Sequence, residues 1–220
     1  MDRYDKIAKR FDWLDSVYFA EKGRNPRTAV MEMLPAGRAR VLDLCCGTLS
    51  NTLDIAQARP ELEITGIDRS EGMLRAAERK VLSRGAKNVR LLCADAANTR
   101  LPGGSFDCVV IGLVLHECSP GQRGALLGEA RRLLVPGGSL IVLEWERAKT
   151  LRQRVKFAPL YLGEILSSGD FKQFYESDKS VLLASHGFIT ERTERCNYTV
   201  VIRLVKIAAH PQSIEKSGLS

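Results

Sequence analysis

One stretch constrains the fold more than any other: an apolar run over Val41–Leu44 that leads into a glycine turn at Gly47. A helical pattern follows from about Ser50, which predicts a strand, a sharp turn and a helix N-terminus. In an open parallel sheet, ligands bind at the carboxyl ends of the strands. Gly47 lets the backbone approach a ligand closely, and Asp43 can accept a hydrogen bond from a cationic ligand group. The alternative for this stretch alone is an ordinary strand-to-helix turn.

Further apolar runs predict six more strands along the chain. They cover residues 62–68, 89–93, 106–112, 139–144, 188–195 and 198–206. The expected helices are 2–20, 27–34, 52–58, 70–82, one opening at Ser119–Pro120, one within 147–166, and 177–185. The alternation of strand and helix favours a parallel α/β sheet with helices on both faces. The last two runs indicate a hairpin, so the final strand is expected to run antiparallel to the others.

Composition bounds the class of protein. With 220 residues, 45% of them hydrophobic, the chain can form one domain with a sizeable core. We expect this domain to cover residues 1–206 and residues 207–220 to be a disordered tail. No apolar stretch reaches the length of a membrane span, and the polar N-terminus does not resemble a signal peptide. The six cysteines form no Cys-x-x-Cys pair, which indicates a reduced, cytoplasmic protein without a metal site.

The formal net charge of +7 is compatible with a solvated surface, an anionic substrate, an anionic membrane or nucleic acid. Residues 147–166 combine a basic row with an apolar stripe at helical spacing. The row is Arg147, Lys149, Arg152, Arg154 and Lys156, and the stripe is Leu151, Val155, Ala158, Leu162, Ile165 and Leu166. This pattern is typical of a helix that lies on a membrane or lines an acceptor pocket. A surface helix docked on the sheet is the alternative. Pro159 is expected to kink or divide the helix.

Several motifs together resemble a class I S-adenosylmethionine-dependent methyltransferase of the ubiquinone/menaquinone-biosynthesis C-methyltransferase type. The motifs are Tyr4-Asp5-Lys6-Ile7-Ala8 with Phe11-Asp12, Cys45-Cys46-Gly47-Thr48, Ser70-Glu71-Gly72-Met73-Leu74, Ser105-Phe106-Asp107 and Leu134-Val135-Pro136-Gly137-Gly138. The resemblance covers roughly residues 1–206 and implies a Rossmann-like fold of seven strands. Family members often read Asp-x-Gly-x-Gly-x-Gly, and here Cys45 and Leu49 occupy the outer glycine positions.

The resemblance also implies a cofactor, S-adenosyl-L-methionine, and the residues that hold it. Asp43 with Gly47 and Thr48 would hold the amino-acid end, and Asp68 would accept from the two ribose hydroxyls. Asp95 and Ala96 would read adenine, Met73 would pack on it, and Gly112 would approach the methionine moiety. The expected cofactor-binding set is Asp43, Gly47, Thr48, Asp68, Arg69, Met73, Asp95, Ala96 and Gly112.

Methyl transfer from a sulfonium depends mainly on alignment of donor and acceptor. We expect residues 1–34 to form a lid and residues 147–176 to form an insertion on the acceptor side. The catalytic candidates are His116, Glu144 and Tyr161; His116 could be a general base or a positioning residue. The expected acceptor is a small, hydrophobic molecule such as a quinol or a lipid-like compound. Peripheral contact with an anionic membrane is a further expectation.

Three other functions compete with this prediction. A nicotinamide-dependent oxidoreductase needs Gly-x-Gly-x-x-Gly, of which residues 45–50 supply only Gly47. An RNA methyltransferase would suit the basic charge, but the sequence contains no recognisable RNA-binding module, so nucleic acid is disfavoured. A cofactor-binding protein without catalytic activity is the third, because bulk at Leu49 could crowd the cofactor. The acceptor atom and the oligomeric state stay open at this stage.

Overall fold

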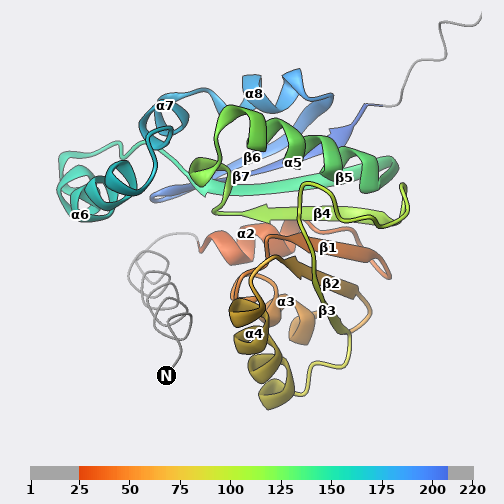
Figure 1. Ribbon diagram of the computed structural model, residues 1–220. Helices are drawn as coiled ribbons and strands as arrows, with labels where there is room; N and C mark the ends of the chain where they lie inside the picture. The colour runs from red at the N-terminus through yellow and green to blue at the C-terminus, as the bar shows by residue number, and fades with distance from the viewer. Residues whose placement is uncertain (1–24, 208–220) are drawn as a thin grey trace, which may run out of the picture.

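The computed structural model describes residues 25–207, which form a sheet of seven strands in the order β3-β2-β1-β4-β5-β7-β6 (Figure 1). The strands are β1 Arg40–Leu44, β2 Glu63–Asp68, β3 Val89–Cys93, β4 Phe106–Gly112, β5 Leu134–Trp145, β6 Phe188–Cys196 and β7 Thr199–Lys206. Strands β1 to β5 pair in parallel, whereas β7 runs antiparallel to both β5 and β6. The Rossmann-like methyltransferase fold expected from the sequence is therefore confirmed.

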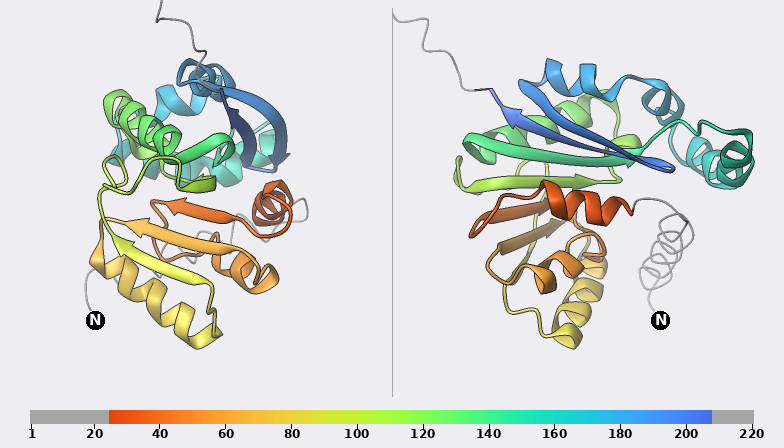
Figure 2. Two further views of the ribbon diagram at one scale, coloured as in Figure 1. Left: turned by 90° about the vertical axis from the view of Figure 1, so that its right-hand side faces the viewer. Right: turned by 180° about the vertical axis from the view of Figure 1, so that it is seen from behind.

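Helices cover both faces of the sheet (Figure 2). On one face lie α2 Pro26–Met33, α3 Leu53–Ala58 and α4 Glu71–Arg84. On the other lie α5 Pro120–Leu133, α7 Phe171–Glu176 and α8 Lys179–Ser185. The helix α6 Leu151–Ser167 projects from one end of the molecule, and a short turn of 3-10 helix covers Leu115–Glu117. Side chains of β1, β4 and β5 alternate between the two faces, so each face has its own hydrophobic core.

Local sequence signals account for several helix ends. Ser119 and Gln122 form a capping box at the start of α5, as the Ser-Pro signal predicted. Ser70 accepts from the amide of Met73 at the start of α4, and Gly85 ends that helix in a left-handed conformation. These caps hold the N-termini of both helices at the carboxyl edge of the sheet.

Two helices differ from the sequence-based prediction. The helix α6 runs through Pro159 without a break, so Pro159 does not divide it. The short helix α7 was not predicted, because its six residues are too few for a periodic pattern. No helix in the described range 25–207 is long and apolar enough to cross a membrane. Most of the expected lid, residues 1–24, and the expected tail from 208 onward lie outside the described residues.

Gly66 in β2 leads to the first prediction. A Cβ atom there would lie 3.0 Å from each of three side chains, those of Cys46, Leu49 and Leu91. We expect Gly66→Ala to lower the free energy of unfolding by about 1–3 kcal/mol, because overpacking a closed core forces its neighbours out of their rotamers. Urea denaturation measures the change. Gly128→Ala is the control, since Gly128 is exposed in α5 with no atom near its Cβ position, and there the free energy of unfolding should stay equal or rise. Equal effects of the two substitutions would contradict the prediction.

Candidate functional site at the carboxyl edge of the sheet

The turn after β1 has an unusual backbone. Cys45, Gly47 and Leu49 have φ angles of 67°, 53° and 63°, so every second residue is left-handed. Such angles are disfavoured for residues other than glycine. They occur at Cys45 and Leu49, the two positions where the family pattern has glycine. The turn therefore keeps the path that a glycine-rich loop would follow, and the position of a Cβ on Gly47 meets no atom within 4 Å.

Leu49 does not crowd the open side of this turn. Its side chain is fully buried in a small core with Cys46, Leu53 and Ala77, beneath α3 and α4. Gly66 on the neighbouring strand makes room for it, since a Cβ at Gly66 would lie 3.0 Å from Leu49 Cδ1. The bulk that raised a doubt in the sequence is thus accommodated in the core rather than at the edge of the sheet.

Asp43 is a buried acid directly below the turn. Its carboxylate is 2% exposed and accepts a hydrogen bond of 2.6 Å from Thr52 Oγ1. Burial raises the pKa of Asp43 from 3.8 to about 7; the Thr52 hydrogen bond opposes this rise and the nearby Asp68 carboxylate adds to it. A cationic ligand group beside Asp43 would favour the ionised carboxylate.

Asp68, at the end of β2, links the turn after β1 to the turn that follows β2. One carboxylate oxygen accepts from the amide of Gly47 at 2.9 Å and the other from the amide of Ser70 at 2.8 Å. Thr48 Oγ1 lies 2.8 Å from Ser50 Oγ and accepts from Lys80 Nζ at 2.9 Å. The structure therefore brings Asp43, Gly47, Thr48 and Asp68 together at one edge of the sheet, as the sequence predicted.

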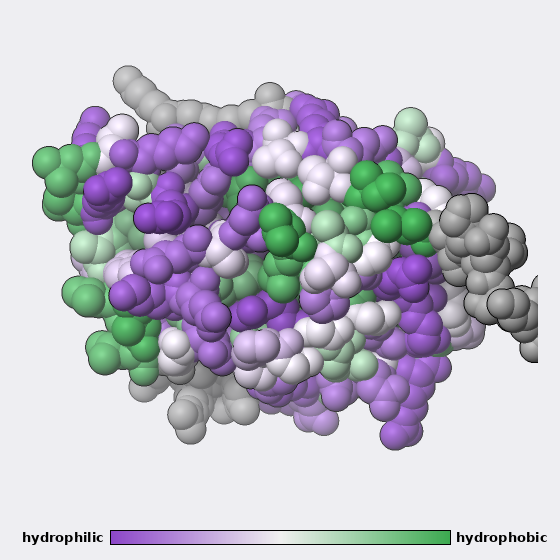
Figure 3. Space-filling view, turned by 90° about the horizontal axis from the view of Figure 1, so that it is seen from above, coloured by the Kyte–Doolittle hydropathy of each residue, from purple (hydrophilic) through white to green (hydrophobic). Residues whose placement is uncertain are grey.

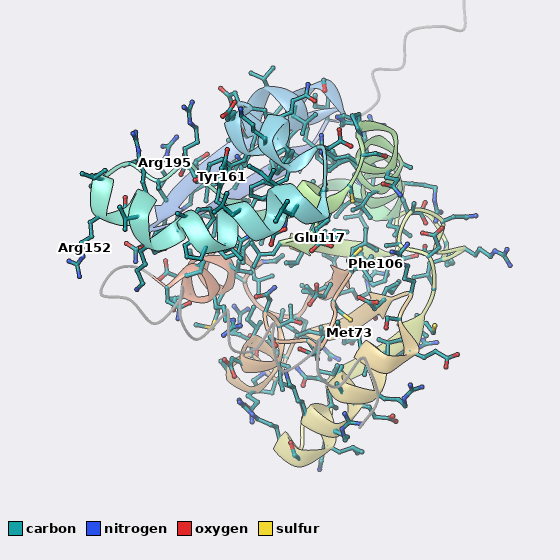
Figure 4. All side chains as sticks on the ribbon, turned by 60° about the vertical axis from the view of Figure 1, so that its left-hand side comes forward. Met73, Phe106, Glu117, Arg152, Tyr161 and Arg195 are labelled. Carbon is teal, nitrogen blue, oxygen red and sulfur yellow. The ribbon has the colours of Figure 1, made fainter. Side chains whose placement is uncertain are left out.

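The remaining expected cofactor contacts surround this group. Met73 is half-buried in the first turn of α4, Arg69 and Asp95 are exposed, and Ala96 is buried. The Asp95 carboxylate accepts a hydrogen bond of 2.9 Å from the amide of Ala97, two residues further on, and so stabilises the turn in which it lies. Figure 4 shows Met73 on α4, across the edge of the sheet from Glu117. No ligand contact tests these assignments, and they stay predictions.

Asn51 is a polar residue of this site that the sequence did not single out. Its Oδ1 atom is buried and has no hydrogen-bond partner among residues 25–207, and its Nδ2 atom lies against Gly112, where a Cβ would approach to 2.7 Å. A buried acceptor without a donor costs free energy, so it points to a group that binds there. Asn51 and Asp43 thus present acceptors to the polar, cationic end of a ligand.

His116 and Glu144 form a second buried constellation. His116 Nδ1 lies 2.8 Å from Glu144 Oε2, and both side chains are almost fully buried. Glu144 also accepts from the amides of Val114, Leu115 and Trp145. Burial alone would raise the pKa of Glu144, but the His116 ring and the backbone donors hold it below its usual range. Burial opposes the charged form of His116, yet the facing carboxylates, chiefly Glu144, raise its pKa.

The other side of the His116 ring faces two further carboxylates. His116 Nε2 lies 3.9 Å from a carboxylate oxygen of Glu117 and 3.8 Å from one of Glu164 on α6. Partial burial, together with the carboxylates of Glu164 and Glu144, raises the pKa of Glu117 even though His116 lowers it. The sequence predicted His116 and Glu144 but neither of these glutamates, because only the packing of α6 brings residue 164 to the loop after β4.

Aromatic rings surround this second constellation. The His116 ring centroid lies 5.6 Å from that of Phe171 and 6.4 Å from that of Trp145. Tyr161, the third catalytic candidate, lies on α6 and contacts the rings of Phe171 and Tyr175. The structure therefore places Tyr161 in the aromatic cluster next to His116, and its catalytic role stays a prediction.

Comparisons with known proteins agree with this architecture. Residues 41–138 match a family model described as "Methyltransferase domain". The chain is 35% identical over 185 residues to a demethylmenaquinone methyltransferase of Thermus thermophilus, which covers 81% of this chain and 82% of that protein. It is 36% identical over 143 residues to a demethylmenaquinone methyltransferase of Geobacillus kaustophilus. The matched segment covers 64% of this chain but only 60% of that relative's length.

A solved structure shares the fold. The crystal structure of a SAM-dependent methyltransferase from Aquifex aeolicus superposes with a TM-score of 0.67 at 19% identity, covering 94% of this chain and all of that one. At this identity the likeness shows the arrangement of helices and strands and carries no information on the acceptor.

The raised pKa of Asp43 leads to the second prediction. Between its ordinary pKa of 3.8 and its folded value of about 7, Asp43 holds a proton in the folded chain that the unfolded chain has released. Stability therefore falls as the pH rises through this window. Relative to Asp43→Asn, the wild type should lose about 2–3 kcal/mol of unfolding free energy between pH 5 and pH 8. Urea denaturation of both proteins at each pH measures this, and parallel pH profiles would contradict it.

Proposed function

The chain belongs to the S-adenosylmethionine-dependent methyltransferase family that includes the demethylmenaquinone methyltransferases, and from that premise we propose that it methylates a small, apolar acceptor of the reduced-quinone class. The observation that carries the proposal is the convergence of Asp43, Gly47 and Asp68 at the open turn after β1. The acceptor class comes from the relatives' names and from the aromatic surroundings of His116.

The residues at the turn fit S-adenosyl-L-methionine. Asn51 Oδ1 is an acceptor without a donor in the described part of the chain, Asp43 is a buried acid, and Gly47 leaves open space there, which together suit an amino group and a carboxylate. When bound, this cofactor supplies the electrophilic methyl group and its leaving group. The chain contributes binding and orientation: Asp43 would become ionised beside the cationic end, and the amides of the turn would face the carboxylate end.

Asp68 would hold the ribose. Its oxygens already accept from the amides of Gly47 and Ser70, so the carboxylate is oriented by the backbone before any ligand binds. A carboxylate has about four acceptor positions, which leaves room for two hydroxyl donors. Met73 and Ala96 would flank the base, and Asp95 would accept from its exocyclic amine.

An apolar, aromatic acceptor suits the far side of the site. Trp145, Phe171 and Tyr161 lie around His116, beyond the end of β4. Flat rings pack favourably against such side chains in offset or edge-on geometry. In this proposal a quinol ring binds at the rim of this cluster, in which the rings of Trp145 and Phe171 are themselves buried. The catalytic assignments of His116, Glu144 and Tyr161 belong to this proposal.

The third prediction tests cofactor and acceptor together. Wild-type protein should bind S-adenosylmethionine by calorimetry and form S-adenosylhomocysteine with a reduced demethylated naphthoquinone. Asp68→Ala should weaken cofactor binding at least ~10-fold, because a hydrogen bond to a charged group contributes roughly 1.5–3 kcal/mol. Asp54→Ala is the control, since Asp54 is an exposed acid on α3 that pairs with Arg84. Absence of cofactor binding by the wild type would end the proposal, and cofactor binding without turnover would overturn the acceptor class.

We also propose that α6 contacts an anionic membrane surface, which would give the protein access to a lipid-soluble acceptor. Leu151, Val155, Leu162 and Leu166 are 59–87% exposed. At 3.6 residues per turn they fall within an arc of about 60° on one side of the helix. The opposite side buries Phe157 and Leu160 against Trp145 and Tyr198. The helix is therefore apolar on two faces, and residues 25–207 cover one of them.

The position of this exposed face differs from the sequence-based expectation. Leu151, Val155 and Leu162 were expected to close over the acceptor; in the described part of the chain they are exposed and are not packed against another element. Figure 3 shows hydrophobic surface gathered at the end of the molecule that α6 forms. Arg152, Arg154 and Lys156 are exposed on the same helix, and basic side chains beside an apolar stripe suit anionic lipid headgroups.

Liposome co-sedimentation provides the fourth prediction. The protein should bind vesicles of phosphatidylglycerol and phosphatidylcholine, and binding should weaken as the salt concentration rises. Leu162→Ser with Leu166→Ser, and separately Arg152→Ser with Lys156→Ser, should each reduce the bound fraction several-fold, because apolar area and charge both contribute. Leu82→Ser is the control, since Leu82 is 74% exposed but lies on α4. Equal losses for Leu82→Ser and the α6 variants would count against this surface.

A further inference from the structure

The imidazole of His116 is held in one orientation. Its ring is 3% exposed, and Glu144 Oε2 lies 2.8 Å from Nδ1. Glu144 accepts hydrogen bonds from three backbone amides and is ionised, so it can only accept a hydrogen bond from His116. The proton of this hydrogen bond must therefore be on Nδ1 of His116. In the neutral ring this leaves the lone pair on Nε2. That nitrogen has no hydrogen bond within the described part of the chain.

Two carboxylates from different elements face this nitrogen. Glu117 follows His116 in the short 3-10 turn (Figure 4). Glu164 comes from the last part of α6. The potential ligand atoms of His116, Glu117 and Glu164 all lie within 4.8 Å of one another. The carboxylates of Glu117 and Glu164 repel each other, and each raises the pKa of a neighbour in the group.

We propose that His116, Glu117 and Glu164 bind a divalent cation, with Mn²⁺ or Zn²⁺ as the class of ion. A buried imidazole whose other nitrogen donates to a carboxylate is the arrangement that orients histidine ligands in metal sites. One nitrogen and two carboxylate ligands suit ions of intermediate softness better than Mg²⁺, which prefers oxygen alone. Ligands at about 2.1 Å from a shared ion lie roughly 3.0–3.5 Å apart, so the observed distances require a closure of about 1 Å.

The site is chemically unlike the one that the cysteines could have formed. The cysteines predict no metal site, because no pair of them has ligand spacing. This cluster uses no cysteine, and its third ligand is 47 residues along the chain from Glu117, so no local motif announces it. The negative charge of two carboxylates, neutralised by the ion, explains why they converge on a buried histidine.

Three protein ligands leave coordination positions for another oxygen. If the acceptor is a quinol, a point that rests on the proposed function, its hydroxyl oxygen would occupy such a position and lose its proton more readily. Binding of the ion itself does not depend on that function. Glu144 would then be a positioning residue that acts through His116, rather than a group that touches the acceptor.

The fifth prediction uses Mn²⁺ as the probe, because thiolates bind it weakly. Electron paramagnetic resonance of free Mn²⁺ should show one binding site per chain, and Zn²⁺ should compete for it. Glu164→Gln and Glu117→Gln should each weaken binding at least 10-fold; Glu117 is 47% exposed, so its variant should fold normally. Glu144→Gln should weaken binding about 10–100-fold through loss of the oriented imidazole.

Glu146→Gln is the matched control, since Glu146 lies two residues after Glu144, directly after β5, but pairs with Arg195 outside the cluster. Its affinity for Mn²⁺ should equal that of the wild type. Failure of the wild type to bind Mn²⁺ or Zn²⁺ more tightly than ~1 mM, or equal binding by the Glu164→Gln variant, would overturn the proposal. Calorimetry with S-adenosylmethionine on the same samples separates this outcome from a failure of the methyltransferase function, because these variants leave the cofactor turn unchanged.

Discussion

The turn between β1 and α3 is the constraint on which the rest of the site depends. Three left-handed residues in five, Cys45, Gly47 and Leu49, bend the backbone so that Gly47 faces open space and its amide reaches Asp68. Left-handed backbone at two non-glycine residues is unfavourable by itself. Burial of Leu49 against Gly66 compensates for part of that cost, since a fully buried leucine contributes roughly 1.5–3 kcal/mol. The geometry of the loop therefore depends on the packing of the core, to which Leu49 in the turn after β1 and Gly66 on β2 both contribute.

Two buried acids at the same edge of the sheet have pKa values shifted in opposite directions by their surroundings. Asp43 and Glu144 are both nearly inaccessible, yet the pKa of Asp43 is raised and that of Glu144 is lowered. The two carboxylates differ in their hydrogen-bond donors. Asp43 accepts one hydrogen bond, from the hydroxyl of Thr52. Glu144 accepts hydrogen bonds from three backbone amides and faces the His116 ring. An acid with few donors is ready to respond to a cationic ligand. An acid with many donors is a fixed anchor that orients its neighbour.

The helix α6 joins the two functional proposals at the acceptor side. Its buried face supplies Phe157 and Leu160 to the aromatic cluster and brings Glu164 to His116. Its exposed face presents Leu151, Val155, Leu162 and Leu166 at the end of the molecule. A helix anchored at its C-terminal part beside the site and apolar on its outer face would place an entrance for a lipid-soluble acceptor next to the chemistry.

Local sequence patterns were enough to predict the fold class, seven strands of which only β5 starts well before its predicted bound, and the placement of Asp43, Gly47, Asp68, His116 and Glu144 at one edge of the sheet. They were enough because periodicity, glycine turns and capping residues are local signals, and parallel strands bring their carboxyl ends to a shared edge. Three contacts could be seen only in the folded chain: Leu49 turns into the core, Asn51 meets Gly112, and Glu164 approaches His116. Those contacts join residues on different elements, and their distances depend on how helices pack, for which no pattern in the chain carries a signal.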